Sequence, residues 1–148
     1  MVSLMHPVST IGYERAPLDQ VIDRLHAGGV ELVIDVRAVD ASRRAGYSKT
    51  ILGTSLGAAG VDYLHLRYLG TPKAGRDAAR AGRTAQMQAI FREHLATSAA
   101  QAALEAAIVA AKDKRACLLC YEEDPACCHR TLVAEAITAR TGAKIVHL

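Results

Sequence analysis

Short, nearly continuous apolar runs alternate along the chain with segments whose apolar residues recur at helical spacing. Residues 31–37 form one such run, which is typical of a strand buried on both faces of a parallel sheet. Leu18, Val21 and Leu25 show the helical spacing. The runs predict strands over residues 8–13, 31–37, 61–66, 115–121 and 143–148. The periodic segments predict helices over about residues 17–27, 48–59, 84–97, 99–113 and 129–141.

The alternation of strands and helices predicts an α/β fold, because a parallel sheet is built from strands joined by crossover helices. We expect residues 1–148 to form a single domain, a three-layer sandwich with a mostly parallel sheet of about five strands and helices on both faces. Residues 70–83 are rich in Gly, Ala and Arg without clear periodicity, which predicts a mobile loop or a broken helix. Ligands of such sheets bind outside the carboxyl ends of the strands.

The charge is unevenly distributed, although the formal net charge is only +3. Residues 37–92 contain 10 basic and 3 acidic side chains, whereas the segments on either side are slightly acidic. This distribution argues against a generally cationic, histone-like protein and predicts a local patch for an anion such as a phosphate or a nucleic acid. The chain has five Tyr, one Phe and no Trp, which disfavours a binder of single strands built on stacking platforms.

The four cysteines are expected to be thiols. The sequence contains no run of about 18 apolar residues, so it predicts no membrane span. Residues 1–7 lack the basic and apolar regions of an export signal. We therefore expect a cytoplasmic protein without a membrane partner, in which disulfides are absent. The sequence leaves the oligomeric state open, a homodimer included.

Reactive side chains follow the predicted strands. Residues 120–130 lead through an acidic turn into a helix, whose free N–H groups favour an anion and lower the pKa of a nearby thiol. Cys120 or Cys128 is the predicted nucleophile or redox thiol, and Glu122 or His129 the group that moves a proton. The predicted anion-binding residues are Gly12, Tyr13, Arg37, Ser42, Arg43 and Arg130. Together they predict an enzyme that acts on a phosphate-bearing substrate, such as a nucleotide or a nucleic acid.

Each of these residues also has a structural interpretation. A free cysteine is usually a small buried apolar group, which is the interpretation favoured for Cys117 inside its apolar run. For Cys120 and Cys128 the structural and the reactive interpretations are about evenly balanced, because each lies at the end of a predicted element beside charged residues. Glu122 can instead form an ion pair with a neighbouring arginine. His129 can cap the helix rather than transfer a proton.

Two other functional classes compete with an enzyme. One is a nucleic-acid-binding or DNA-repair-associated module that uses the basic residues 67–92 without chemistry. The other is a metal site of Cys120, Cys128 and His129, with or without Glu122, because thiolates and imidazole suit zinc or iron. Adjacent helical residues point about 100° apart, so Cys128 and His129 are not expected to share an ion. Neither a metal nor a cofactor is predicted.

Several short motifs resemble one family. They are Thr10-Ile11-Gly12, Asp35-Val36-Arg37 followed by Ser42-Arg43, Tyr63-x-His65-Leu66, Leu69-Gly70, and Cys120-x-Glu122-x-x-Pro125-x-x-Cys128-His129-Arg130. The chain resembles the domain of unknown function 488 family over nearly its whole length, and the last motif is the most specific in its spacing. The resemblance implies an α/β fold and a site without naming a reaction. The residues it carries over are Arg37, Cys120, Glu122, Cys128, His129 and Arg130.

Overall fold

The computed structural model describes residues 5–39 and 41–148, which form a five-stranded sheet. The strands are β1 (Val8–Gly12), β2 (Leu32–Asp35), β3 (Asp62–His65), β4 (Ala116–Cys120) and β5 (Ile145–His147). Their spatial order is β3-β2-β4-β1-β5, and every neighbouring pair is parallel. Each strand lies within a predicted run, so the predicted α/β fold is confirmed.

The register of the sheet brings the carboxyl ends of the strands to one edge. Gly12 of β1 is paired with Cys120 of β4. Asp35 of β2 is paired with His65 of β3 and with Leu119 of β4. Residues from four segments that are far apart in the sequence therefore begin their loops side by side.

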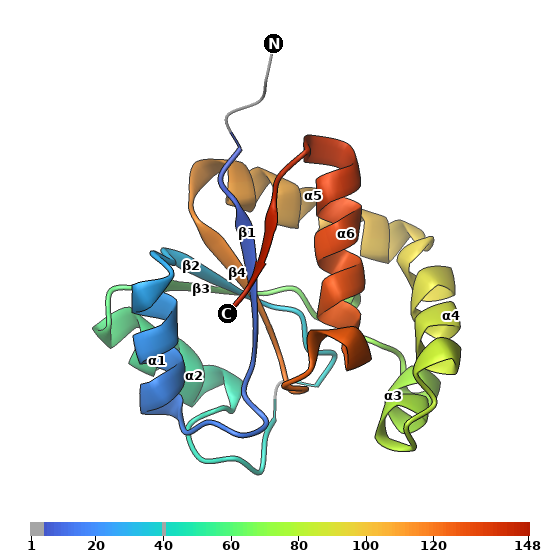
Figure 1. Cartoon of the computed structure of the whole chain (residues 1–148), viewed down its shortest axis with the longest axis horizontal. Helices are drawn as coiled ribbons and strands as arrows, with labels where there is room; N and C mark the ends of the chain where they lie inside the picture. Colours follow the sequence, from blue (N-terminus) through green and yellow to red (C-terminus); the bar gives the residue numbers. More distant parts are fainter. Residues whose placement is uncertain (1–4, 40) are drawn as a thin grey trace.

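Helices cover both faces of the sheet (Figure 1). On one face, α1 (Leu18–Ala27) and α2 (Lys49–Ala58) bury a core that includes Val33 and Leu119. On the other, α5 (Ser98–Asp113) and α6 (His129–Thr141) bury a core that includes Ile34 and Leu118. Neighbouring residues of a strand point to opposite faces, and every residue of β1, β2 and β4 is buried. Among the described residues, no helix is long and apolar enough to cross a membrane.

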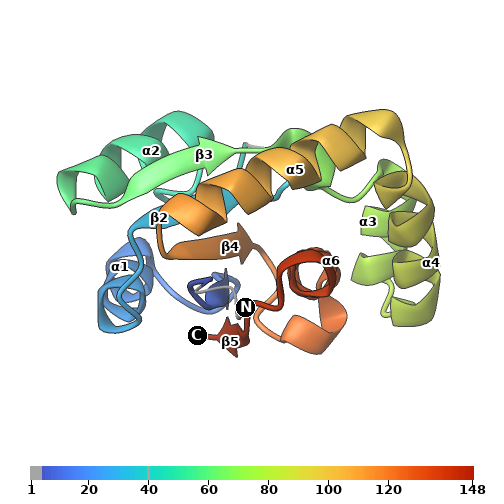
Figure 2. The same ribbon diagram turned by 90° about the horizontal axis from the view of Figure 1, so that it is seen from above.

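A pair of helices stands beyond the carboxyl ends of the strands (Figure 2). It consists of α3 (Lys73–Arg80) and α4 (Thr84–Leu95), and it follows the 3-10 turn η1 (Arg67–Leu69). α3 contacts α4, and α4 contacts α6. The pair therefore lies at the edge where the register gathers the strand ends.

The helix α3 corrects the prediction of a mobile loop or broken helix at residues 70–83. Its buried side consists of Gly75 and Ala78, which are too small to produce an apolar period in the sequence. A Cβ on Gly75 would lie 2.2 Å from the Thr71 side chain, so a larger residue there would require the Thr71 side chain to shift. Asp77 adds exposed ion pairs to Lys73 and Arg80 within the same helix.

Candidate active site

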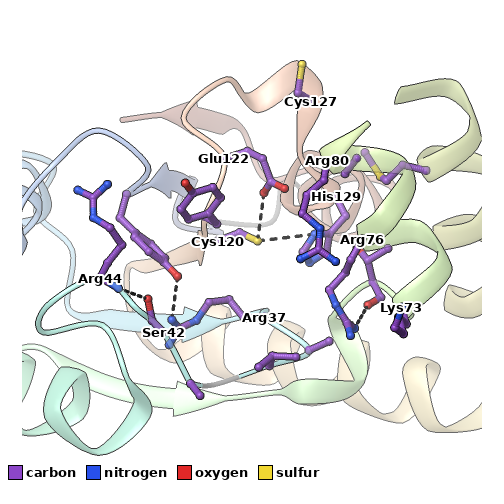
Figure 3. A pocket seen from close by; sticks show the side chains of 18 of the residues that line it. Arg37, Ser42, Arg44, Lys73, Arg76, Arg80, Cys120, Glu122, Cys127 and His129 are labelled. Atoms are coloured by element: carbon purple, nitrogen blue, oxygen red, sulfur yellow. Dashed lines mark hydrogen bonds between the residues drawn. The ribbon is translucent and has the colours of Figure 1, made fainter. Parts of the chain in front are cut away.

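A cavity of about 730 Å³ opens at the carboxyl edge of the sheet (Figure 3). Its walls come from the ends of β1, β2 and β4, from the loop after β2, and from α3 and α4. The predicted site residues that line it are Tyr13, Arg37, Ser42, Arg43, Cys120, Glu122 and His129. The predicted residues Gly12, Cys128 and Arg130 are not among its lining residues.

Two thiols and an imidazole meet at one side of the cavity. The Sγ atoms of Cys120 and Cys128 and a ring nitrogen of His129 all lie within 4.8 Å of one another, and all three residues are buried. We call these residues the Cys–His cluster. Cys120 Sγ lies 3.7 Å from His129 Nδ1 and 3.7 Å from the Glu122 carboxylate (Figure 3). Glu122 therefore borders the cluster on the cavity side.

The cluster forms because Cys128 is not helical. A 3-10 turn η2 (Pro125–Cys127) precedes α6, and the Asp124 side chain accepts a hydrogen bond from Ala126 N at its start. Cys128 is the N-cap of α6 with an extended backbone, φ −125° and ψ 139°, and His129 is the first helical residue. The helical angle assumed for Cys128 and His129 therefore does not apply, and their donor atoms lie within 4.8 Å of each other.

A backbone contact sets the orientation of His129. Its Nε2 donates a hydrogen bond of 2.8 Å to the carbonyl oxygen of Val36 in the loop after β2. A carbonyl oxygen only accepts, so the proton of a neutral imidazole is on Nε2. The lone pair on Nδ1 then faces Cys120. The ring of Phe91 packs against the imidazole with a centroid distance of 5.2 Å.

The surroundings of the Cys–His cluster favour a negatively charged thiolate at Cys128. Burial raises the pKa of Cys128, but hydrogen bonds with Cys120 and His129 and the charges of His129 and Arg130 outweigh it, so the pKa lies well below its usual range. The hydrogen bond to Cys128, together with burial, raises the pKa of Cys120. Burial, with the negative charge of Cys128, raises the pKa of Glu122 to about 7. The thiolate form, which attacks electrophiles and binds metals, is thus favoured at Cys128.

Arg37 lines the cavity within a buried polar network. Its guanidinium forms two hydrogen bonds to Asp35, of 2.9 Å and 2.7 Å, and a third of 3.0 Å to the hydroxyl of Tyr13. Tyr63 donates a further hydrogen bond of 2.6 Å to Asp35. The side chains of Arg37 and Asp35 are 5% and 0% exposed, so this is a buried ion pair. Asp35 therefore offsets much of the positive charge that Arg37 brings to the cavity.

Arg130 stabilises the loop that carries Glu122. It is 1% exposed, and its guanidinium donates to the backbone carbonyl oxygens of Glu122 and Glu123. The alternative ion pair between Glu122 and an arginine does not occur among the described residues. Gly12 packs closely against the same loop, since a Cβ at this position would lie 1.9 Å from the carbonyl oxygen of Glu122.

Several lining residues were not among the predicted residues of the active site, although three of them belong to the basic segment 67–92. Lys73, Arg76 and Arg80 of α3 line the cavity, and so does Arg44 of the loop after β2. The three α3 residues follow at intervals of three and four, which is the spacing of one helix face. We call them the cationic face of α3. That spacing would have identified them, had residues 73–80 been taken as a helix.

Comparison with known proteins assigns the chain to a family. No curated protein and no solved structure matches it. A family model described as "Domain of unknown function DUF488" matches residues 17–137. The matched region contains the Cys–His cluster, Glu122, Arg37 and the cationic face of α3. The match confirms the resemblance seen in the sequence motifs. The chain belongs to the DUF488 family.

Proposed function

We propose that the protein is an enzyme that binds a phosphate-bearing substrate in the cavity and acts on it with groups of the Cys–His cluster and Glu122. One observation carries the proposal: cationic side chains and reactive groups line the same cavity. Among the described lining residues, the single carboxylate is Glu122. The cations are Arg37, Arg43, Arg44, Lys73, Arg76 and Arg80. Such a concentration of positive charge favours an anion over a neutral or cationic ligand.

The cationic face of α3 supplies the best phosphate donors. Arg76 donates one hydrogen bond of 2.9 Å, to the neutral carbonyl oxygen of Thr71, which leaves its charge and its other N–H groups for a ligand. Lys73 and Arg80 share the exposed carboxylate of Asp77. Arg37, by contrast, is neutralised by Asp35. Recognition of the anion therefore rests mainly on the cationic face of α3, which lies outside the motif at residues 120–130.

The size of the cavity supports a small substrate or the end of a larger one. Its volume of about 730 Å³ lies within the roughly 300–1,000 Å³ that small-molecule sites occupy. A mononucleotide fits this space, and so does a terminal nucleotide of a nucleic acid. We propose these two as the substrate class.

The reactive groups lie where a bound phosphate ester would meet them. Cys120, Glu122 and His129 line the same cavity as the cationic face of α3 (Figure 3). Glu122 is placed to exchange a proton with a substrate or a water in the cavity. The chemistry that this arrangement favours is cleavage or transfer at the phosphate or at the bond next to it.

The replacement Arg76→Ala is expected to weaken the binding of inorganic pyrophosphate about tenfold. A hydrogen bond from a charged donor contributes roughly 1.5–3 kcal/mol, and 1.4 kcal/mol corresponds to a factor of ten in affinity. Isothermal titration calorimetry at low ionic strength measures the change. Arg92→Ala on α4, an exposed arginine outside the cavity, is the matched control and should bind like the wild type. Equal losses in the two variants, or no binding by the wild type, would refute the proposed anion site.

Catalysis needs a separate test. Nucleoside mono-, di- and triphosphates and short 5′-phosphorylated oligonucleotides are incubated with the wild type and with Glu122→Gln, and the products are separated by chromatography. We expect one substrate class to be turned over by the wild type and at least a hundredfold more slowly by the variant, within the usual range for loss of an acid–base group. Tight binding of the whole set without turnover would favour a non-catalytic nucleic-acid-binding module instead.

A further inference from the structure

We propose that Cys120, Cys128 and His129 bind one zinc-class divalent metal ion at the side of the cavity. The proposal starts from their donor atoms. Two thiols and one imidazole nitrogen lie within 4.8 Å of one another in a buried position. Thiolate and imidazole are the ligands that zinc and its close substitutes prefer.

The distances match those between ligands of a single ion. Zinc lies about 2.3 Å from a thiolate sulfur and about 2.0–2.1 Å from an imidazole nitrogen, so two such ligands of a tetrahedral ion are roughly 3.6 Å apart. Cys120 Sγ and His129 Nδ1 are 3.7 Å apart. These two side chains therefore already have the separation that a shared ion requires.

The surroundings of His129 support a ligand role. Metal-binding histidines usually donate the proton of their second ring nitrogen to a carbonyl or carboxylate, which orients the ring and fixes the tautomer. His129 makes this contact through Nε2 to Val36 O at 2.8 Å. The nitrogen left with a lone pair is Nδ1, the one that faces Cys120.

Three protein ligands leave one position of a tetrahedral ion open, and two of the three ligands line the cavity. Cys120 and His129 line the cavity, whereas Cys128 does not. Glu122 borders the cluster, with a carboxylate oxygen 3.7 Å from Cys120 Sγ. Catalytic zinc sites typically combine three protein ligands with an open position for water or substrate. The catalytic meaning of the ion rests on the proposed function, but metal binding itself does not.

The other two cysteines provide internal controls. Cys127 is exposed in η2 next to Cys128, and it lies outside the cluster. Cys117 is buried in the core that faces α1 and α2, on the opposite side of the sheet from Cys120. A protein that binds metal through thiols in general would use Cys127 as readily as Cys128. The proposed site would not.

Titration of reduced, untagged protein with Co²⁺ tests the proposal. We expect one Co²⁺ per chain, with the intense thiolate-to-cobalt absorption in the near ultraviolet, and displacement of Co²⁺ by one equivalent of Zn²⁺. Cys128→Ser and Cys120→Ser should weaken Co²⁺ binding more than a hundredfold, whereas Cys127→Ser should leave it unchanged. A wild type that binds neither ion stoichiometrically, or equal losses in Cys127→Ser and Cys128→Ser, would overturn the proposal.

Two further measurements keep the outcome clear. Alkylation of the wild type with iodoacetamide, followed by peptide mass spectrometry, should show that Zn²⁺ protects Cys120 and Cys128 but not Cys127. This readout needs no variant to fold, and absence of that selective protection would count against the site. Arg76→Ala should retain the cobalt spectrum, so loss of pyrophosphate binding and loss of metal binding are separately visible.

Discussion

The replacement Asp35→Asn is expected to lower the free energy of unfolding by about 3–5 kcal/mol. Asp35 is fully buried and accepts two hydrogen bonds from the Arg37 guanidinium and one from the hydroxyl of Tyr63. Asparagine has nearly the same shape but no charge, so the buried guanidinium loses its counter-charge without a cavity being created. Chemical denaturation with urea, followed by circular dichroism, measures the loss.

An exposed ion pair supplies the matched comparison. Asp62 pairs with Lys114, and their side chains are 58% and 41% exposed. Asp62→Asn should therefore cost less than about 1 kcal/mol, because solvent screens the charges of an exposed pair. Similar losses for Asp35→Asn and Asp62→Asn would show that the Asp35–Arg37 pair contributes no more than a surface contact.

The replacement Gly12→Ala is expected to destabilise the protein by about 3 kcal/mol or more, at the upper end of the cost of overpacking. The added Cβ would lie 1.9 Å from the carbonyl oxygen and 2.6 Å from the carbonyl carbon of Glu122. These are backbone atoms and cannot rotate away. The loop that carries Glu122 must then move, so we expect turnover of the substrate to fall together with stability. Urea denaturation and the product assay measure the two effects.

Gly57→Ala serves as the control for Gly12→Ala. Gly57 lies in α2, and a Cβ there would have no described atom within 4 Å. Alanine is favoured over glycine within a helix by up to about 1 kcal/mol, so this variant should be slightly more stable than the wild type. Loss of stability in Gly57→Ala comparable to that in Gly12→Ala would contradict the steric explanation.

The layers of the fold were predictable because each of the strands and of the larger helices leaves a local pattern in the sequence. The run at residues 31–37 is continuous and apolar since β2 is buried on both faces, and the glycines at 28–29 and 60 mark where helices end. The helix α3 was not predictable in the same way. Its buried face consists of Gly75 and Ala78, so its packing against α4 depends on small size rather than on apolar area.

The site was predictable in its residues but only partly in its arrangement. The sequence placed Cys120 at the end of a strand and Cys128 near the start of a helix, and the structure brings both thiols together with His129. The directions of Cys128 and His129 depended on the single extended residue at the N-cap, which no pattern in the sequence indicates. The ion pair of Arg37 with Asp35, unlike the orientation of Cys128 and His129, follows from a regular pattern in the sequence. Asp35 is two residues away on an extended segment, so the two side chains share one face, and the pair could have been inferred.

The strand order also determines when the site can form during folding. β1 ends at Gly12, yet it lies between β4, which begins at Ala116, and β5, which begins at Ile145. Closing so long a loop costs entropy before any strand contact repays it, so pairing of this kind slows folding. As the chain is synthesised, β1 stays without its neighbours until most of the protein has emerged. The cavity, which is lined by residues that follow β1 as well as by residues of β4 and its loop, can therefore be completed only after β4 has been synthesised.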